Sequence, residues 1–132
     1  MTQILVVDDS PTIRRMVKAA LATLPPPIEF LEAASGLEAI ERLALGTVNL
    51  IVLDLNMPDM HGLEVIGFVR AHQKYRHVPI VVLTTRGDEE SRQAALQAGA
   101  NSYLTKPFLP QGLVSEAAAL LSAVAGPGTV RR

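Results

Sequence analysis

The chain has 132 residues, of which 48% are hydrophobic, and this suits one compact domain with a buried core. Its formal net charge of -1 provides no long-range field that would favour direct contact with nucleic acid or an anionic membrane. The sequence has no cysteine and no apolar run near the ~20 residues of a membrane span, and its first residues lack the features of a signal peptide, so we expect a cytoplasmic domain without membrane insertion.

Short apolar runs bounded by turn residues predict strands, and longer segments with apolar residues at helical spacing predict helices. In chain order, the expected elements are a strand at 4–7, a helix at 11–24, a strand at 28–33, a helix at 36–46, a strand at 48–53, a helix at 62–72, a strand at 80–83, a helix at 89–99, a strand at 101–104 and a helix at 113–124.

Start signals support the predicted helices. Ser10 and Asp88 are typical N-cap residues, and each stands directly before a helical pattern. Ser35 and Glu38 have the spacing of a capping box. The helix after Asp88 has only one bulky apolar residue, Leu96, so we expect it to dock weakly on the rest of the domain.

The alternation of strands and helices, with strands that are apolar on both faces, is typical of a parallel sheet covered on both sides. Glu29 and Glu32 place charges on the second strand and favour an edge position for it. Five strand–helix units are too few for an eight-stranded barrel. We therefore expect an α/β fold, an open doubly wound sheet of five parallel strands with helices on both faces.

Polar residues stand at the ends of four of these units. Asp8 and Asp9 follow the first strand, Asp54 follows the third, Thr84 follows the fourth and Lys106 follows the fifth. The carboxyl ends of parallel strands meet at one edge, where ligands bind in open α/β sheets. Clustered carboxylates repel one another unless a cation lies among them, and oxygen-only ligands suit Mg²⁺. The charge of Lys106 and the hydroxyl of Thr84 can stabilise the oxygens of a phosphoryl group during transfer. The pattern therefore indicates phosphoryl transfer to Asp54.

Five motifs occur in a fixed order along the chain: Val7-Asp8-Asp9-Ser10, Leu53-Asp54-Leu55-Asn56-Met57-Pro58, Leu83-Thr84-Thr85, Ala98-Gly99-Ala100 and Lys106-Pro107-Phe108. On these motifs the sequence resembles a receiver domain of two-component response regulators, similar to the single-domain chemotaxis (CheY-like) type. The resemblance implies the flavodoxin-like strand order 2-1-3-4-5. It also implies a receiver domain at residues 1–125, followed by a loose C-terminal tail at 126–132.

The resemblance further implies a role for each site residue. Asp54 would accept a phosphoryl group from a sensor histidine kinase or a histidine phosphotransfer protein. Lys106 would contact that group, and its peptide bond to Pro107 would be cis. The implied Mg²⁺ ligands are Asp9, Asp54 and the backbone carbonyl of Asn56, with Asp8 acting through a metal-bound water.

In this family, phosphorylation changes a surface. Thr84 would close on the phosphoryl group, Tyr103 would swing inward, and the face formed by the fourth helix, fifth strand and fifth helix would change for a downstream protein. Asn56 and Arg86 occupy positions that tune the lifetime of the phosphoryl group. Thr85 stands where the family often has Ala or Gly, and its bulk could limit the switch.

Three alternatives stay open on the sequence. A Mg²⁺-dependent phosphohydrolase with an Asp nucleophile would need a cap or substrate pocket, and a flavin-binding module would need a donor-rich loop after the first strand. A receiver-like scaffold would act without phosphorylation. Arg14 and Arg15 are expected to be solvated, and His61, His72 and His77 are expected to be ordinary surface histidines.

Overall fold

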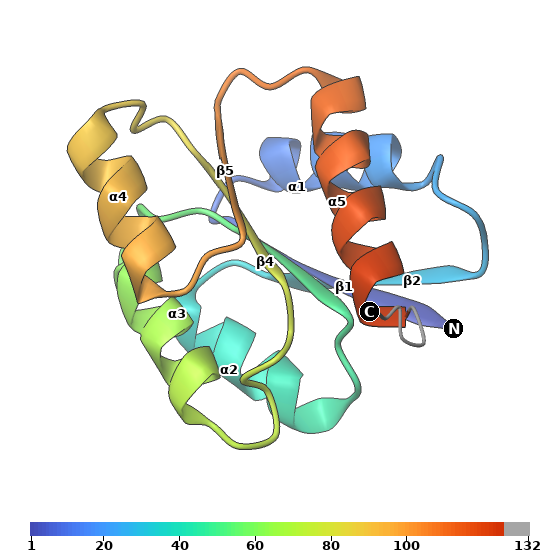
Figure 1. Cartoon of the computed structure of the whole chain (residues 1–132), viewed down its shortest axis with the longest axis horizontal. Helices are drawn as coiled ribbons and strands as arrows, with labels where there is room; N and C mark the ends of the chain where they lie inside the picture. The colour runs from blue at the N-terminus through green and yellow to red at the C-terminus, as the bar shows by residue number, and fades with distance from the viewer. Residues whose placement is uncertain (126–132) are drawn as a thin grey trace.

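The computed structural model describes residues 1–125, and the predicted tail at 126–132 lies outside the described residues. Strands and helices alternate through the described part of the chain (Figure 1). The strands are β1 (Thr2–Val7), β2 (Ile28–Ala33), β3 (Leu50–Leu53), β4 (Ile80–Thr84) and β5 (Ser102–Thr105). The helices are α1 (Pro11–Leu21), α2 (Gly36–Leu45), α3 (Gly62–Ala71), α4 (Glu89–Ala98) and α5 (Pro110–Ala125).

The five strands form one parallel sheet in the order β2-β1-β3-β4-β5, which confirms the predicted topology. β2 is an edge strand, as its charges Glu29 and Glu32 indicated. The chain moves outward in one direction from β1 to β2 and in the other from β3 to β5. The change of direction lies between β1 and β3, where open sheets of this kind have their ligand crevice.

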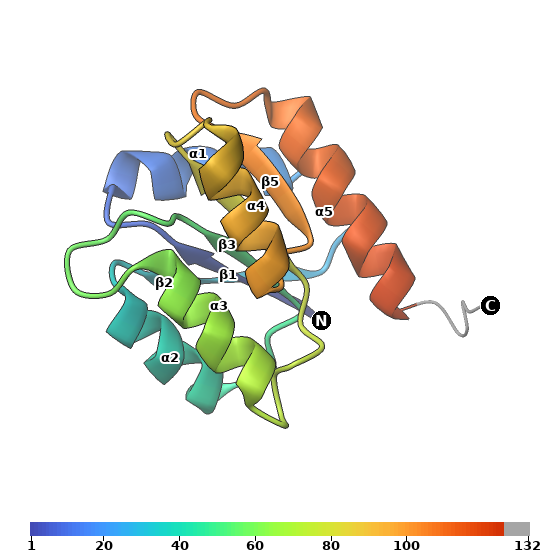
Figure 2. The same ribbon diagram turned by 60° about the vertical axis from the view of Figure 1, so that its left-hand side comes forward.

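Helices cover both faces of the sheet, with α2, α3 and α4 on one face and α1 and α5 on the other (Figures 1 and 2). Successive residues of β1 show how the two cores form. Leu5 and Val7 pack in the core under α2, α3 and α4, whereas Ile4 and Val6 pack in the core under α1 and α5. Each such side chain contributes about 1.5–3 kcal/mol by leaving water. Burial on both sides explains why β3 and most of β1 and β4 are continuously apolar.

The predicted N-caps are present, with one difference. The side chains of Ser10 and Asp88 each accept the N–H of the residue three positions later, at 3.2 and 3.0 Å. Ser35 also accepts from the N–H of Glu38 at 3.2 Å. The Glu38 carboxylate, however, accepts the N–H of Ala34 at 2.9 Å, one residue before the expected partner. The side chains of Ser35 and Glu38 therefore both stabilise the start of α2, although Glu38 binds the N–H of Ala34 instead of that of Ser35.

Several element ends differ from the sequence prediction by one to three residues, and three of them are instructive. α1 ends at Leu21, although Leu24 is buried, because tighter turns continue to that residue. β3 begins at Leu50, two residues late, because the side-chain oxygen of Asn49 accepts the Gln3 N–H at 2.8 Å. α5 begins at Pro110, three residues before its first buried leucine.

The thin apolar face predicted for α4 is observed, since Ala95 is its one fully buried residue. Its C-terminal end is instead held by Arg70 of α3, whose guanidinium donates to the Gly99 carbonyl at 3.0 and 2.8 Å. The same guanidinium donates to the Val78 carbonyl at 2.7 Å and to the side-chain oxygen of Asn101 at 3.0 Å. Arg70 thus joins α3, the end of α4 and the segments that lead into β4 and β5.

Candidate functional site

Backbone hydrogen bonds place two acids at the carboxyl edge of the sheet. The N–H of Asp8 donates to the Ala33 carbonyl and the N–H of Asp54 donates to the Val7 carbonyl, both at 3.0 Å. These bonds extend the strand pairing one residue beyond β1 and β3. The two acids therefore lie on the rigid end of the sheet, next to the change of direction in strand order.

Three carboxylates and one lysine meet at this edge. Ligand atoms of Asp8, Asp9 and Asp54 all lie within 4.8 Å of one another. Asp8 and Asp54 are buried, with 3% and 5% of their surface exposed, whereas Asp9 is exposed. The Lys106 ammonium lies 2.7 Å from Asp8 Oδ2 and 3.6 Å from Asp54 Oδ2. The structure thus brings together the acids and the cation that the sequence predicted.

Burial raises the pKa of Asp54, an effect that Lys106 opposes and the charge of Asp8 reinforces. A buried carboxylate with a like charge beside it gains from a further cation. The group offers only carboxylate oxygens, and one of its acids faces solvent, which is the chemistry that suits Mg²⁺ with some of its waters retained. The residues present therefore fit this ion.

The Thr84 side chain is fully buried at the end of β4, and its hydroxyl oxygen accepts the Arg86 N–H at 3.4 Å, a long contact. The Lys106 N–H donates to the Thr84 carbonyl at 2.8 Å, so the lysine and the hydroxyl are fixed relative to each other. Half-buried Tyr103 donates its hydroxyl proton to the Arg86 carbonyl. Thr84, Tyr103 and the β4–α4 loop are thus directly connected.

The remaining predicted residues lie around this group. The exposed Asn56 follows β3 closely, and its N–H donates to Asp54 Oδ1 at 3.3 Å. The Arg86 side chain is half exposed and pairs with Asp88 at 3.5 Å. The Lys106–Pro107 peptide bond is cis, as expected. A second cis bond, between Pro26 and Pro27, was not predicted.

The prediction that Arg14 is solvated is wrong. Only 15% of its side chain is exposed; it donates to the Asp8 carbonyl at 2.6 Å and to Glu32 at 2.8 Å. Glu32 also binds Lys18 at 2.7 Å, and these two hydrogen bonds lower the pKa of the Glu32 carboxyl. The i, i+4 spacing of Arg14 and Lys18 opposite an acidic edge strand was the available signal. Arg15 is exposed, as expected.

Sequence reasoning also missed two anchors in the loop after Asp54. The exposed Asp59 accepts the N–H groups of Gly36 and Leu37, each at 3.0 Å. His61 caps α3, and the Glu64 carboxylate accepts the N–H of His61 at 3.1 Å. The His-x-x-Glu spacing was a signal for this cap, although histidine is an unusual N-cap residue.

The other histidines, His72 and His77, are exposed. Tyr75, which was expected on a solvated face, is instead buried against the ring of His72 at a centroid distance of 4.3 Å. Its aromatic surface extends the core beneath α3.

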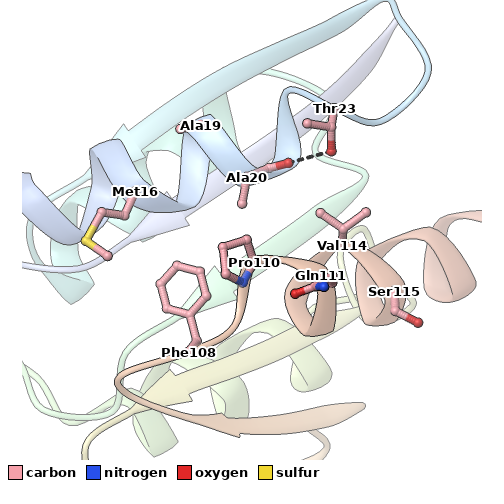
Figure 3. A pocket seen from close by; sticks show the side chains of 9 residues that line it. All are labelled: Met16, Ala19, Ala20, Thr23, Phe108, Pro110, Gln111, Val114 and Ser115. Carbon is pink, nitrogen blue, oxygen red and sulfur yellow. Dashed lines mark hydrogen bonds between the residues drawn. The ribbon is translucent and has the colours of Figure 1, made fainter.

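A groove of about 670 Å³ lies away from the acids, between α1 and α5 (Figure 3). Its walls are mainly apolar, and Met16 and Phe108 lie at one end of it (Figure 3). No residue of the acid cluster lines this groove. It is therefore a separate surface feature.

Comparisons with known proteins agree with the fold and identify a family. The family described as the response regulator receiver domain matches residues 4–118. The chain is 42% identical over 127 residues to a chemotaxis protein CheY homolog of Campylobacter jejuni, covering 96% of this chain and 97% of that protein. It is 43% identical over 112 residues to chemotaxis protein CheY1 of Helicobacter pylori, covering 84% and 90%. The crystal structure of the response regulator CheY4 of Vibrio cholerae is similar with a TM-score of 0.81 at 36% identity, covering 91% and 98%.

The chain belongs to the response regulator receiver domains, and this family match together with the CheY relatives indicates a regulatory, non-enzymatic domain. It is a phosphorylation-activated signalling switch related to the chemotaxis CheY proteins. The phosphohydrolase and scaffold alternatives are not favoured. Among the helices of residues 1–125, none is both long enough and apolar enough to cross a membrane.

Proposed function

We propose that Asp54 accepts a phosphoryl group from the phosphohistidine of a sensor histidine kinase or a histidine phosphotransfer protein. A carboxylate oxygen of Asp54 would attack phosphorus as the phosphorus–nitrogen bond breaks. The imidazole of the donor would take up one proton from water, so the donor would become a neutral histidine. The observation that carries this proposal is the position of Asp54, buried at the carboxyl edge of the sheet with Asp8, Asp9 and Lys106 around it.

Asp9, Asp54 and the Asn56 carbonyl would hold Mg²⁺ directly, and Asp8 would act through a bound water. The ion would neutralise the oxygens of the transferring phosphoryl group. Lys106 contributes a second positive charge to the same oxygens, from a side chain that is 12% exposed and already paired with Asp8. The residues of this chain thus orient the acceptor and limit water around it.

Thr84 and Tyr103 would transmit the phosphorylation. A phosphoryl group brings nearly two negative charges and new acceptor oxygens next to Thr84. The Thr84 hydroxyl has only a long contact to the Arg86 N–H, so its proton is available as a donor. Movement of the hydroxyl would release space beneath the Tyr103 ring, which is bonded to the same loop. The face of α4, β5 and α5 would then present a different surface to its target.

Asn56 and Arg86 would set the lifetime of the phosphorylated state, including any autodephosphorylation. Both are exposed at the rim of the site, where a side chain can restrict the approach of water to the phosphorus. Thr85 is also exposed, and its bulk would narrow the access of the phosphodonor to Asp54.

The domain carrying this activity would extend over residues 1–125, since α5 continues beyond the matched segment 4–118. We place it in the cytoplasm, and the absence of cysteine from the sequence is compatible with a reducing compartment. Its output would be contact with a downstream protein.

The test is incubation with Mg²⁺ and a small acyl phosphate, followed by intact mass. The wild type should gain one phosphoryl group and Asp54→Ala none. Asp88→Asn is the matched control: it removes an exposed carboxylate near the site but retains an N-cap oxygen, so it should still be phosphorylated. Equal gain by wild type and Asp54→Ala would exclude Asp54 as the acceptor. Repeated turnover of phosphomonoesters would favour a phosphohydrolase.

A further inference from the structure

The β3–α3 loop, residues 54–61, carries two of the proposed Mg²⁺ ligands. It is held to the start of α2, which lies on the same face of the sheet as α3. Asp59 lies five residues after Asp54, and its two carboxylate oxygens each accept one backbone N–H at the start of α2, from Gly36 and Leu37. These bonds lower the pKa of Asp59 although its side chain is exposed. Its carboxylate is therefore fully ionised at neutral pH, with both oxygens engaged.

A second contact reinforces this one. Gly36 lies so close to Met60 that a Cβ at position 36 would stand 2.8 Å from the Met60 Cβ. The loop is closed at its base by a 2.8 Å hydrogen bond from the Gly62 N–H to the Leu55 carbonyl. Its middle is thus attached to α2 by one ion–amide contact and one packing contact.

Asn56 is held less firmly than its neighbour Leu55, which is buried and whose carbonyl accepts the Gly62 N–H. Asn56 is exposed, and its N–H makes a long 3.3 Å bond to Asp54 Oδ1. An ion that binds the Asn56 carbonyl must order this backbone, and that ordering opposes binding. A contact that fixes the loop before the ion binds therefore raises the affinity for the ion.

We propose that Asp59 is a positioning residue for the metal site: by fixing the loop to α2, it keeps the Asn56 carbonyl in place to bind Mg²⁺. This inference rests on the proposed function, because it requires that Mg²⁺ binds at Asp9, Asp54 and Asn56. Asp59 itself does not contact the ion. Residues that orient the ligands of a metal without touching the metal itself have the same kind of effect.

A purely structural role would be helix capping, since Asp59 and Ser35 both satisfy N–H groups in the first turn of α2. Ser35 accepts from the Glu38 N–H at 3.2 Å and has no bond to the loop among the hydrogen bonds of residues 1–125. Ser35→Ala therefore weakens the same helix start without releasing the loop, and it is the matched control.

The experiment is calorimetric titration of the full chain with MgCl₂, for wild type, Asp59→Ala, Asp59→Asn and Ser35→Ala. We expect Asp59→Ala to raise the Mg²⁺ Kd about tenfold, the scale seen when residues behind metal ligands are removed. Asp59→Asn keeps one acceptor oxygen and should lie between Asp59→Ala and wild type. Ser35→Ala should lower the Tm yet keep the wild-type Kd.

Amide hydrogen exchange supplies a readout independent of the affinity. In Asp59→Ala the N–H of Asn56 should exchange faster without Mg²⁺ and recover protection at saturating Mg²⁺, whereas in Ser35→Ala it should match wild type. A Kd for Asp59→Ala within about twofold of wild type, or an equal rise in Ser35→Ala, would overturn the positioning role alone. Failure of the wild type to bind Mg²⁺ would overturn the proposed metal site and this inference with it.

Discussion

Lys106 is bound more closely to Asp8 than to Asp54, at 2.7 Å against 3.6 Å. Its charge is therefore shared between Asp8 and the proposed acceptor. Phosphorylation of Asp54 would add charge on the more distant side and draw Lys106 toward it. The ammonium would also compete with the proposed Mg²⁺ for the carboxylates of Asp8 and Asp54.

Lys106→Met removes that competing cation while keeping the aliphatic stem. A like unit charge about 4 Å away is worth about 1 kcal/mol in water and about 4 kcal/mol at an effective dielectric constant of about 20, so Mg²⁺ should bind at least about fivefold more tightly to the variant. Calorimetric titration measures this directly. Weaker binding than in wild type would show that Lys106 positions the carboxylates rather than competing for them.

Glu32→Gln tests the pair that holds Arg14 beside Asp8. Because the pKa of Glu32 is lowered from its ordinary value of 4.5, its stabilising effect is present above that pH and is lost as pH falls through the folded-state pKa. The side chain is 40% exposed, so we expect a loss of only about 0.5 kcal/mol at pH 7. Urea unfolding of both proteins at pH 7 and pH 3 should show the difference shrink. If the difference in the free energy of unfolding is the same at both pH values, Glu32 stabilises the protein by packing and not by its charge.

Arg86→Ala should shorten the life of phosphorylated Asp54, because the side chain lies at the rim of the site and could shield phosphorus from water. Asp88→Asn releases Arg86 from its 3.5 Å pair and should have the opposite effect. Both rates can be followed by the decay of the phosphorylated mass after the donor is removed. Unchanged decay in the two variants would remove Arg86 from the list of lifetime-tuning residues.

Two glycines of α3 should respond oppositely to alanine. A Cβ at Gly62 would lie 2.7 Å from both the Asp54 carbonyl oxygen and the Leu55 Cα, which are backbone atoms that cannot move aside cheaply. Gly62→Ala should cost about 1–3 kcal/mol and disturb phosphorylation of Asp54. At Gly67 a Cβ meets nothing within 4 Å, so Gly67→Ala should stabilise by about 0.5–1 kcal/mol. Thermal unfolding would detect both changes, and equal shifts would contradict the close contact at Gly62.

The fold was predictable because β1, β3 and β4 are buried on both faces and α1, α2 and α4 have clear start signals, so local pattern and global fold agree there. The acids at the carboxyl edge were predictable for the same reason, since strand ends determine where Asp8 and Asp54 lie. Residues whose roles depend on contacts distant in sequence were missed. Arg14 reaches across to Glu32 on β2, for which the i, i+4 spacing of Arg14 and Lys18 was the one signal, and Asp59 reaches back to α2 without any local pattern.

Arg70 has a mechanical consequence for the proposed switch. Its guanidinium fixes the C-terminal end of α4 through the Gly99 carbonyl, while the rest of the helix buries only Ala95. The other end of α4 continues from the Arg86–Asp88 loop beside the acid cluster. If phosphorylation moves that loop as proposed, α4 would turn about its end at Arg70, and its displacement would grow with distance from Arg70. The amplitude of the switch would be largest at the turn nearest the phosphorylation site.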